Sequence, residues 1–305
     1  HEIFMTPTAM LADYVLPGDV FTERNHVADG WSWTTRLALS QKVVEPPAEA
    51  SSTFQFWTDL AHRMGLGDEF PWTSLEDMLD YRLSRGGRTF AEFASETFME
   101  LAPPKFRKYR DTGFATPSGK VELASSVLGD LGFDPLPYYR ALPGQSEEYP
   151  YLVFTGVRED PFFQTGQRNI ESLRRRMPAP SLYLHTSDAE REGLIDGDWA
   201  KLSTPQGVVV AQVAVHETMK AGHIRVPHGW WYPELRGEAS LAGAFISSDA
   251  VLCADSDEWL DHEQGVPHFK GFPGKVEKTT KPEQVTRTTA AHWQADQAVE
   301  AHAES

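Results

Sequence analysis

Two neighbouring stretches combine glycine with side chains that bind anions: residues 154–158 and, a few positions later, residues 163–169. Glycine lets the backbone approach a ligand closely, hydroxyl and amide groups bind phosphate and sugar oxygens, and arginine offers a charged fork of donors. Together they suit the pyrophosphate of a dinucleotide. No Walker loop accompanies them, so a polar surface loop with ordinary turn glycines stays an equal alternative. The candidate residues are Thr155, Gly156, Arg158, Gln164, Thr165 and Arg168.

A third stretch, residues 226–231, places His228 beside a glycine and two tryptophans. The histidine could bond to a ligand or to a backbone carbonyl, and the tryptophans could form a wall of a cofactor cleft. A lone histidine is more often structural. The aromatic pair and the glycine keep the functional interpretation open beside the structural one.

Other polar clusters in the sequence give weaker evidence of a functional site. The run Arg174–Arg176 is typical of a solvated helix face. The acidic stretch 255–263 lacks compact ligand spacing, so it predicts an acidic loop and no metal site. The sequence has no nucleophile elbow and no zinc-protease helix, which leaves ordinary hydrolase chemistry unsupported.

Composition limits the class of protein. A content of 40% hydrophobic and 11% aromatic residues predicts a folded chain, and a net charge of -16 argues against binding of nucleic acid. No apolar run is long enough to span a bilayer, so we expect a soluble protein, with cytoplasm and periplasm both open. The lone Cys253 excludes an iron–sulfur cluster built by this chain alone. The abrupt start predicts a C-terminal piece of a longer enzyme.

The first half has the alternation of an α/β segment. Residues 3–21 predict a strand, a brief helix at Ala9–Ala12 and a second strand. Apolar residues at helical spacing predict a helix over Phe54–Met64, a capping box predicts another from Thr73, and a third is expected over Thr89–Met99.

From Tyr151 onward short runs of β-forming residues dominate, separated by glycine, proline and aspartate turns. They predict a β-barrel interrupted by a single helix, Ser187–Glu192. The expected domains are 1–148 (α/β), 149–280 (barrel) and 281–305 (C-terminal tail). The expected strands are Tyr151–Thr155, Trp199–Ser203, Val208–Val215 and Gly222–Val226.

Several of these stretches resemble, in order, the dimethyl sulfoxide reductase family of molybdopterin oxidoreductases. Each match is weak alone, but together they run over most of the chain. The matching segments are Thr6–Pro17 with Glu23–Asn25, Thr116–Glu122, Thr155–Gly156, Gln164–Asn169, Asp188–Ala189, Gly193–Asp198 and Pro227–Trp231.

The resemblance implies a molybdenum or tungsten enzyme that carries two molybdopterin guanine dinucleotides. The first half would then be part of a Rossmann-like cofactor domain, and the second a double-psi type, dinucleotide-binding barrel. The metal ligand and a [4Fe-4S] cluster would belong to an N-terminal region absent here. By position, the resemblance places the residues already named, together with His228, Asp249 and Lys270, at the cofactor.

Two positions depart from the family pattern. Many members have histidine where this chain has Gln164, and the segment Ser247–Ala250 has Asp249 where an asparagine-containing stretch is expected. An aspartate facing a pyrophosphate would be repelled. We therefore expect Asp249 to accept bonds from guanine or from a backbone amide.

The leading hypothesis is a cofactor-binding portion of an oxidoreductase, inactive alone, whose partners are the N-terminal remainder of the enzyme and, as a candidate, an iron–sulfur electron-transfer subunit. A non-catalytic accessory protein that kept the cofactor-binding barrel is the first alternative. A nucleotide-sugar enzyme with a barrel cap is the second. The substrate, and the choice between molybdenum and tungsten, stay open.

Overall fold

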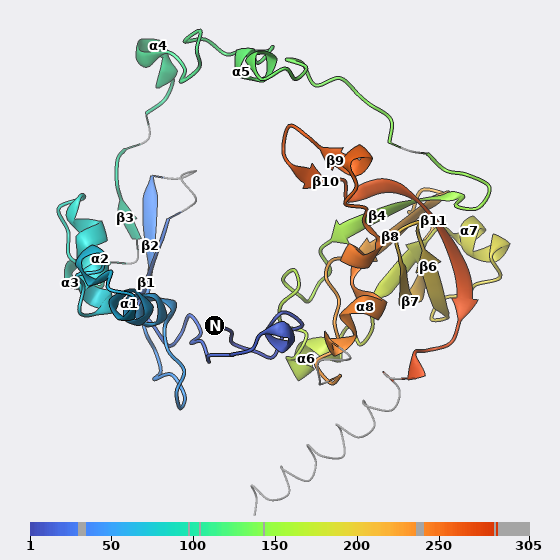
Figure 1. Cartoon of the computed structure of the whole chain (residues 1–305), viewed down its shortest axis with the longest axis horizontal. Coiled ribbons are helices and arrows are strands. Elements are labelled where there is room, and N and C mark those ends of the chain that lie inside the picture. Colours follow the sequence, from blue (N-terminus) through green and yellow to red (C-terminus); the bar gives the residue numbers. More distant parts are fainter. Residues whose placement is uncertain are drawn as a thin grey trace, which may run out of the picture. The chain divides into compact units, whose positions relative to one another are not determined.

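A computed structural model of the chain describes residues 1–29, 35–96, 98–103, 105–142, 144–235, 241–283 and 285. The chain forms two compact units (Figure 1). Unit 1 comprises His1–Met5 and Ala12–Val121, and unit 2 comprises Thr6–Leu11 and Glu122–Ser305. The predicted tail, 281–305, lies outside the described residues apart from 281–283 and 285.

Unit 1 is a small α/β body. Its antiparallel sheet has the order β1-β2-β3, with β1 (His26–Asp29), β2 (Arg36–Ser40) and β3 (Phe98–Glu100). Helices α1 (Thr53–Arg63), α2 (Leu75–Ser84) and α3 (Phe90–Phe93) are each capped by a Ser or Thr side chain that accepts a bond from a first-turn amide. A short helix α4 (Tyr109–Thr112) and two single turns, η1 (Ala9–Leu11, in unit 2) and η2 (Gly67–Glu69), complete the first 121 residues.

Two expectations for this half are wrong. The helix predicted over Thr89–Met99 ends after Phe93, because the following residues enter β3 and place Met99 in the core. The strands expected within residues 3–21 are reduced to isolated bridges, Glu2 with Pro17 and Gly18 with Ser51. The helices expected from Phe54 and Thr73, and the brief helix at Ala9, are confirmed.

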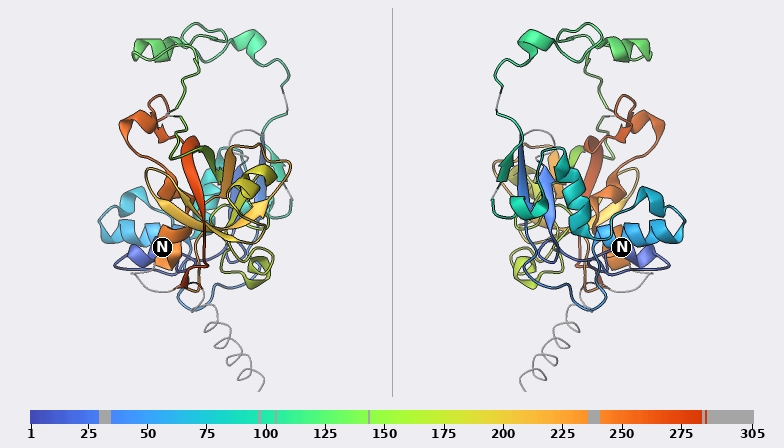
Figure 2. Two further views of the ribbon diagram at one scale, coloured as in Figure 1. Left: turned by 90° about the vertical axis from the view of Figure 1, so that its right-hand side faces the viewer. Right: turned by 90° about the vertical axis from the view of Figure 1, so that its left-hand side faces the viewer.

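Unit 2 contains a closed six-stranded barrel with the order β11-β4-β8-β5-β7-β6 (Figure 2). Strands β4 and β8 run parallel, as do β5 and β7, and the remaining neighbours are antiparallel. The predicted α/β segment followed by a β-barrel is therefore confirmed. The strands are β4 (Tyr151–Val157), β5 (Ser181–Leu184), β6 (Trp199–Ser203), β7 (Val208–Val215), β8 (His223–Pro227) and β11 (Lys270–Thr279).

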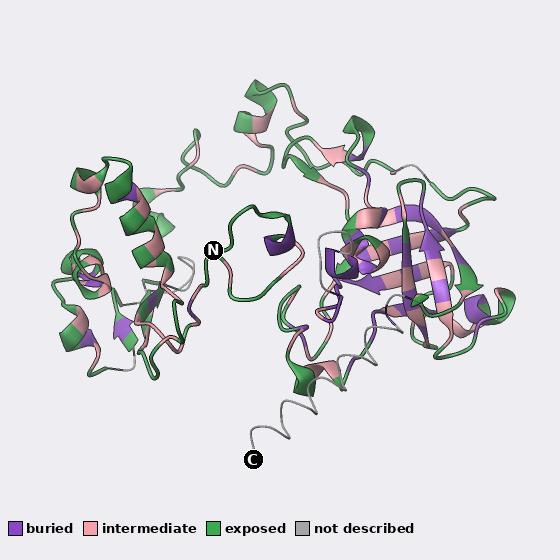
Figure 3. Cartoon of the chain, turned by 60° about the horizontal axis from the view of Figure 1, so that its bottom comes forward, coloured by how far each residue is buried: buried purple, intermediate pink, exposed green. Residues whose placement is uncertain are grey.

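Side chains that point inward from alternate positions of the strands fill the interior of the barrel. Residues 151, 153 and 155 of β4 are buried, and Leu202 of β6 and Ile224 of β8 are fully buried. Figure 3 shows the buried residues gathered on the barrel strands. Side chains that alternate across a strand point to opposite faces, so one face of each strand supplies the core.

The strand β11 is missing from the prediction for a physical reason. Its sequence holds Gly271, Pro273 and Gly274, which usually indicate a loop. The strand pairs first with β4 and then with β6, and a Cβ at Gly274 would lie 2.4 Å from Val153 Cγ2. The glycine therefore permits a close approach where one strand closes the barrel.

The expectation of a single helix in this region is also wrong. Helix α7 (Thr186–Arg191) matches it, but α6 (Glu171–Arg174) and α8 (Ala244–Ser247) lie in the long connections. Each is only four residues long, below the length at which apolar periodicity can be recognised. Other short elements of unit 2 are α5 (Ser126–Asp130), η3 (Leu241–Gly243), η4 (Asp249–Leu252), η5 (Asp257–Trp259), β9 (Leu260–Asp261) and β10 (Val266–Pro267).

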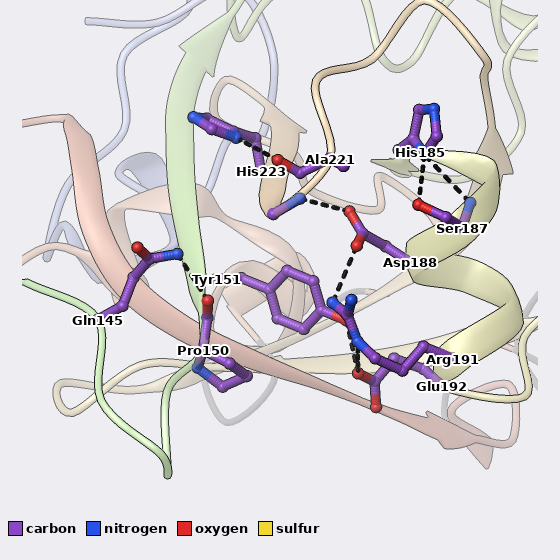
Figure 4. A network of polar contacts seen from close by, with 11 residues as sticks. Gln145, Pro150, Tyr151, His185, Ser187, Asp188, Arg191, Glu192, Ala221 and His223 are labelled. Carbon is purple, nitrogen blue, oxygen red and sulfur yellow. Dashed lines mark hydrogen bonds and ion pairs between the residues drawn. The ribbon is translucent and has the colours of Figure 1, made fainter.

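A polar network fixes α7 at the end of the barrel where β4 begins (Figure 4). Tyr151, fully buried, donates to Glu192 and accepts from Arg191, and burial raises the pKa of its phenol, which keeps it a neutral donor. Asp188, also fully buried, accepts from Arg191 and from the amide of Gly222 at 2.7 Å. The network therefore ties α7 to the first residue of β4 and to the turn before β8.

Candidate functional site

The predicted site residues gather where β4 and β8 end. Because these strands are parallel, their carboxyl ends lie at the same end of the barrel. The amide of His228, just after β8, donates to the carbonyl of Val157, the last residue of β4, at 2.8 Å. Arg158 follows that residue directly. Two stretches separated by 70 positions in the sequence thus become neighbours.

Asp249 joins the two strand ends. Its carboxylate, 4% exposed, accepts from the amide of Gly156 at 2.9 Å and from the amide of Gly229 at 2.7 Å. The ring nitrogen Nδ1 of His228 lies 3.3 Å from the same carboxylate. A buried carboxylate needs such donors to offset its lost hydration. Of the two roles expected for Asp249, the structure shows the bonding to backbone amides.

The loop after β4 turns back onto the His228 turn. Gln164 has a φ of 52°, in the left-handed region, and Thr165 follows it with its side chain against Gly229. A Cβ at Gly229 would lie 2.1 Å from Thr165 Cγ2. The indole N–H of Trp231 donates to the carbonyl of Thr165 at 2.8 Å. The 164–168 turn and the 228–231 turn therefore pack as one unit.

Arg168 lies beneath both turns with only 1% of its surface exposed. Its Nη2 donates to the carbonyls of Gln164 and His228, each at 3.0 Å. Burial, reinforced by the positive charge of Arg174, lowers the pKa of Arg168 to about 10. The guanidinium stays charged at neutral pH, because that pKa is still well above 7.

Arg158 and Lys270 are the accessible cations of this end. Both are exposed, and neither forms a salt bridge with any residue that the structure describes. Lys270 begins β11 and pairs with Phe154 of β4, which places it beside the same strand end. In a chain with a net charge of -16, these two side chains and Arg168 give the site a local positive charge.

Thr155 acts inside the barrel. It is fully buried, and its hydroxyl donates to the carbonyl of Phe269 at 2.7 Å. The structure thus brings all nine predicted residues to one end of the barrel and divides them by exposure. Thr155, Arg168 and Asp249 are buried, Gln164 and His228 are partly buried, and Gly156, Arg158, Thr165 and Lys270 are exposed.

The sequence suggested that the two tryptophans line a cofactor cleft, and the structure does not show this. Sequence analysis also did not predict that Cys253 lies beside Thr155. Trp230 is fully buried and Trp231 is 5% exposed, so both pack inside unit 2 instead of lining an open cleft. Cys253 lies 3.8 Å from the hydroxyl of Thr155, and burial raises the pKa of its thiol. Its position one turn after Asp249 was the available signal.

The described part of the chain contains neither a membrane-spanning helix nor a cluster of metal-binding side chains. None of its helices is long and apolar enough to cross a membrane. Within those same residues, no group of three or more histidine, cysteine, aspartate or glutamate side chains is arranged to hold a metal ion.

Comparison with known proteins identifies the barrel. Residues 152–273 match the family model described as the molydopterin dinucleotide binding domain. Acetylene hydratase of Syntrophotalea acetylenica is 41% identical over 281 residues, which cover 89% of this chain and 38% of that protein. The dimethyl sulfoxide/trimethylamine N-oxide reductase of Rhodobacter capsulatus is 27% identical over 266 residues, covering 76% of this chain and 32% of that protein.

A solved structure gives the same result. Acetylene hydratase from Pelobacter acetylenicus has a TM-score of 0.84 and 40% identity, over 90% of this chain and 39% of that chain. The chain therefore spans about two fifths of the length of these hydratases.

The packing of Thr165 on Gly229 generates a prediction. Gly229→Ala should lower the free energy of unfolding by about 2–4 kcal/mol, because left-handed strain adds to a forced displacement of Thr165. Gly193→Ala is the matched control, since Gly193 also has a positive φ (64°) but a Cβ there meets nothing within 4 Å. It should cost only about 1–2 kcal/mol. Equal losses in denaturant titrations of the two variants would contradict this packing.

Proposed function

Because this chain belongs to the dimethyl sulfoxide reductase family of molybdopterin enzymes, we propose that its barrel binds molybdopterin guanine dinucleotide and orients it for reaction at a metal. The proposal rests on one observation: the segment that matches the family model contains the exposed cationic side chains of the site. The family match to residues 152–273 covers the strand ends at which Arg158 and Lys270 present unpaired charges, within the described residues.

The residues present fit such a cofactor. Gly156 has a φ of 73°, and nothing lies within 4 Å of the position of a Cβ, so the backbone is open to a ligand. Two exposed residues with side-chain donors lie at the same end of the barrel: Arg158, two positions after Gly156, and Thr165, which packs on Gly229. Charged and neutral donors of this kind bind pyrophosphate and sugar oxygens.

Each residue has a distinct part in this proposal. Arg158 holds phosphate oxygens, and Lys270 adds a second positive charge at the same strand end. Thr165 donates its hydroxyl, and His228 presents the ring atom that does not face Asp249. When bound, the cofactor supplies the molybdenum or tungsten centre at which the substrate reacts.

The remaining parts of the enzyme are also proposals. A [4Fe-4S] cluster needs several thiolates, and this chain has the single Cys253. We propose that residues outside these 305 hold the cluster and the metal ligand. An iron–sulfur electron-transfer subunit is the partner that fits an oxidoreductase of this kind.

A second candidate reaction is hydration. The observation that favours it is sequence identity. The chain is 41% identical to acetylene hydratase and 25–29% identical to seven other relatives, which are named as reductases, an oxidoreductase and a formate dehydrogenase. Adding water to a triple bond transfers no net electrons. The two reactions therefore differ in whether a redox partner is consumed.

An assay of the complete, cofactor-loaded protein separates them. Under the hydratase hypothesis, acetylene is converted with no stoichiometric consumption of a dye reductant or oxidant. Under the oxidoreductase hypothesis, turnover of dimethyl sulfoxide, trimethylamine N-oxide or thiosulfate consumes reduced dye in proportion. Inactivity with acetylene, together with dye-coupled turnover of one of the other substrates, would reject hydration.

Cofactor binding itself is tested at Arg158. Arg158→Ala in the complete protein should weaken cofactor retention roughly ten- to hundredfold, because a charge-assisted bond contributes about 1.5–3 kcal/mol and ~1.4 kcal/mol is tenfold. Arg158→Lys should retain the cofactor better than Arg158→Ala but less well than the wild-type protein, since lysine cannot form the bidentate contact. The measurement is guanine dinucleotide bound per chain, with the melting temperature as a check on folding.

Arg175→Ala is the matched control, because that side chain is 68% exposed and pairs with Glu171 at the start of α6. It should leave cofactor content unchanged. Full occupancy in Arg158→Ala would show that this guanidinium is an ordinary surface charge.

A further inference from the structure

Arg168 differs from two partly buried arginines of unit 2, Arg174 and Arg225. Arg174 pairs with Glu234 and Arg225 with Glu159, both at 2.9 Å. Arg168 is more deeply buried than either, yet it forms no salt bridge within the described ranges, and its Nε and Nη1 have no hydrogen-bond partner. A buried charge without a carboxylate is costly, so its retention calls for another cause.

The surroundings of Arg168 come equally from the two turns. The 158–168 loop supplies the carbonyl of Gln164 and the ring of Phe162, whose centroid lies 4.3 Å from the guanidinium carbon. The 228–231 turn supplies the carbonyl of His228 and the ring of Trp230, at 4.5 Å. Carbonyl dipoles and aromatic faces both attract a cation, which offsets the missing carboxylate.

These bonds orient the peptide groups of both turns. The C=O and N–H of a trans peptide point in opposite directions. The peptide between His228 and Gly229 is held at both ends, by Arg168 at its carbonyl and by Asp249 at its N–H. The carbonyl of Gln164 points to Arg168, so the N–H of Thr165 in the same peptide points away from Arg168. Both turns contain positive φ angles, 52° at Gln164 and 55° at Gly229. Glycine adopts such an angle readily, whereas at Gln164 it persists only when neighbours fix it.

We propose that Arg168 is a positioning residue for the cofactor: it fixes the spacing and peptide orientation of the two turns without touching the cofactor. The inference rests on the proposed function, and it replaces the direct contact expected for Arg168 from sequence. It requires the fork of arginine, because one Nη2 reaches two carbonyls while the guanidinium carbon lies 4.3 and 4.5 Å from the centroids of two rings. A point charge cannot reproduce both.

The main experiment compares Arg168→Lys and Arg168→Met in the complete, cofactor-loaded protein. The readouts are the rate of guanine dinucleotide release and the melting temperature of the cofactor-free form. We expect release to accelerate roughly tenfold or more in both variants, the size of a lost charge-assisted bond. If Arg168→Met fails to fold, the release rate of Arg168→Lys alone tests the proposal.

Val213→Ala separates positioning from general loss of stability. Val213 is 3% exposed in the barrel core, so its truncation lowers the melting temperature without altering either turn. Release should stay close to wild type in this variant. If Val213→Ala released the dinucleotide as fast as Arg168→Lys at the same melting temperature, Arg168 would be only a structural residue. That result would overturn the proposal.

A double-mutant cycle with Trp231→Phe gives an independent readout. Trp231 braces the same loop through the carbonyl of Thr165, so its effect on release should be non-additive with that of Arg168→Lys. Strict additivity would contradict a shared action. Rescue of release to the wild-type rate by lysine would show that only the charge matters, which also overturns the proposal.

Failure of this inference is distinguishable from failure of the proposed function. If wild-type protein carries the dinucleotide and the Arg168 variants release it at the wild-type rate, only the positioning role is wrong. If wild-type protein carries no dinucleotide, the proposed function itself is wrong.

Discussion

The carboxylate of Asp249 holds together the end of the barrel on which the proposed site depends. It accepts an amide from the end of β4 and another from the turn after β8, at 2.9 and 2.7 Å. Without these bonds, Gly156 and Gly229 would leave two amides without acceptors at positions of positive φ. Asp249 is therefore a structural acceptor, and the accessible donors around it remain available for a ligand.

The peptide group between residues 228 and 229 is bound on opposite sides by two buried side chains of opposite charge. Asp249 binds the N–H of the 228–229 peptide and Arg168 binds its carbonyl, and the attraction to Asp249 partly counters the lowering of the pKa of Arg168 by burial. The buried pair forms no direct salt bridge among the described residues. The accessible Arg158 and Lys270 then provide positive charge on a chain that is acidic as a whole.

Sequence patterns predicted the elements whose signal is local. The strand Val208–Val215 follows from its run of β-forming residues, and helix α1 follows from helical spacing of apolar residues. The strand β11 did not, because Gly271, Pro273 and Gly274 serve barrel closure, which is a tertiary demand. The nine site residues were predicted to share one site, and they share one end of the barrel. Their exposure could not be predicted, since the burial of Arg168 depends on Trp230, 62 positions away.

Amide hydrogen exchange, measured on cofactor-loaded and cofactor-free protein, tests the central claim most directly. The account predicts slower exchange in the loaded protein for residues 156–168 and 228–231, at the carboxyl ends of β4 and β8. It predicts unchanged exchange at α7 and around Gly222, where the Tyr151 and Asp188 network already fixes the opposite end. Protection confined to that opposite end, or no protection at the two turns, would contradict the account.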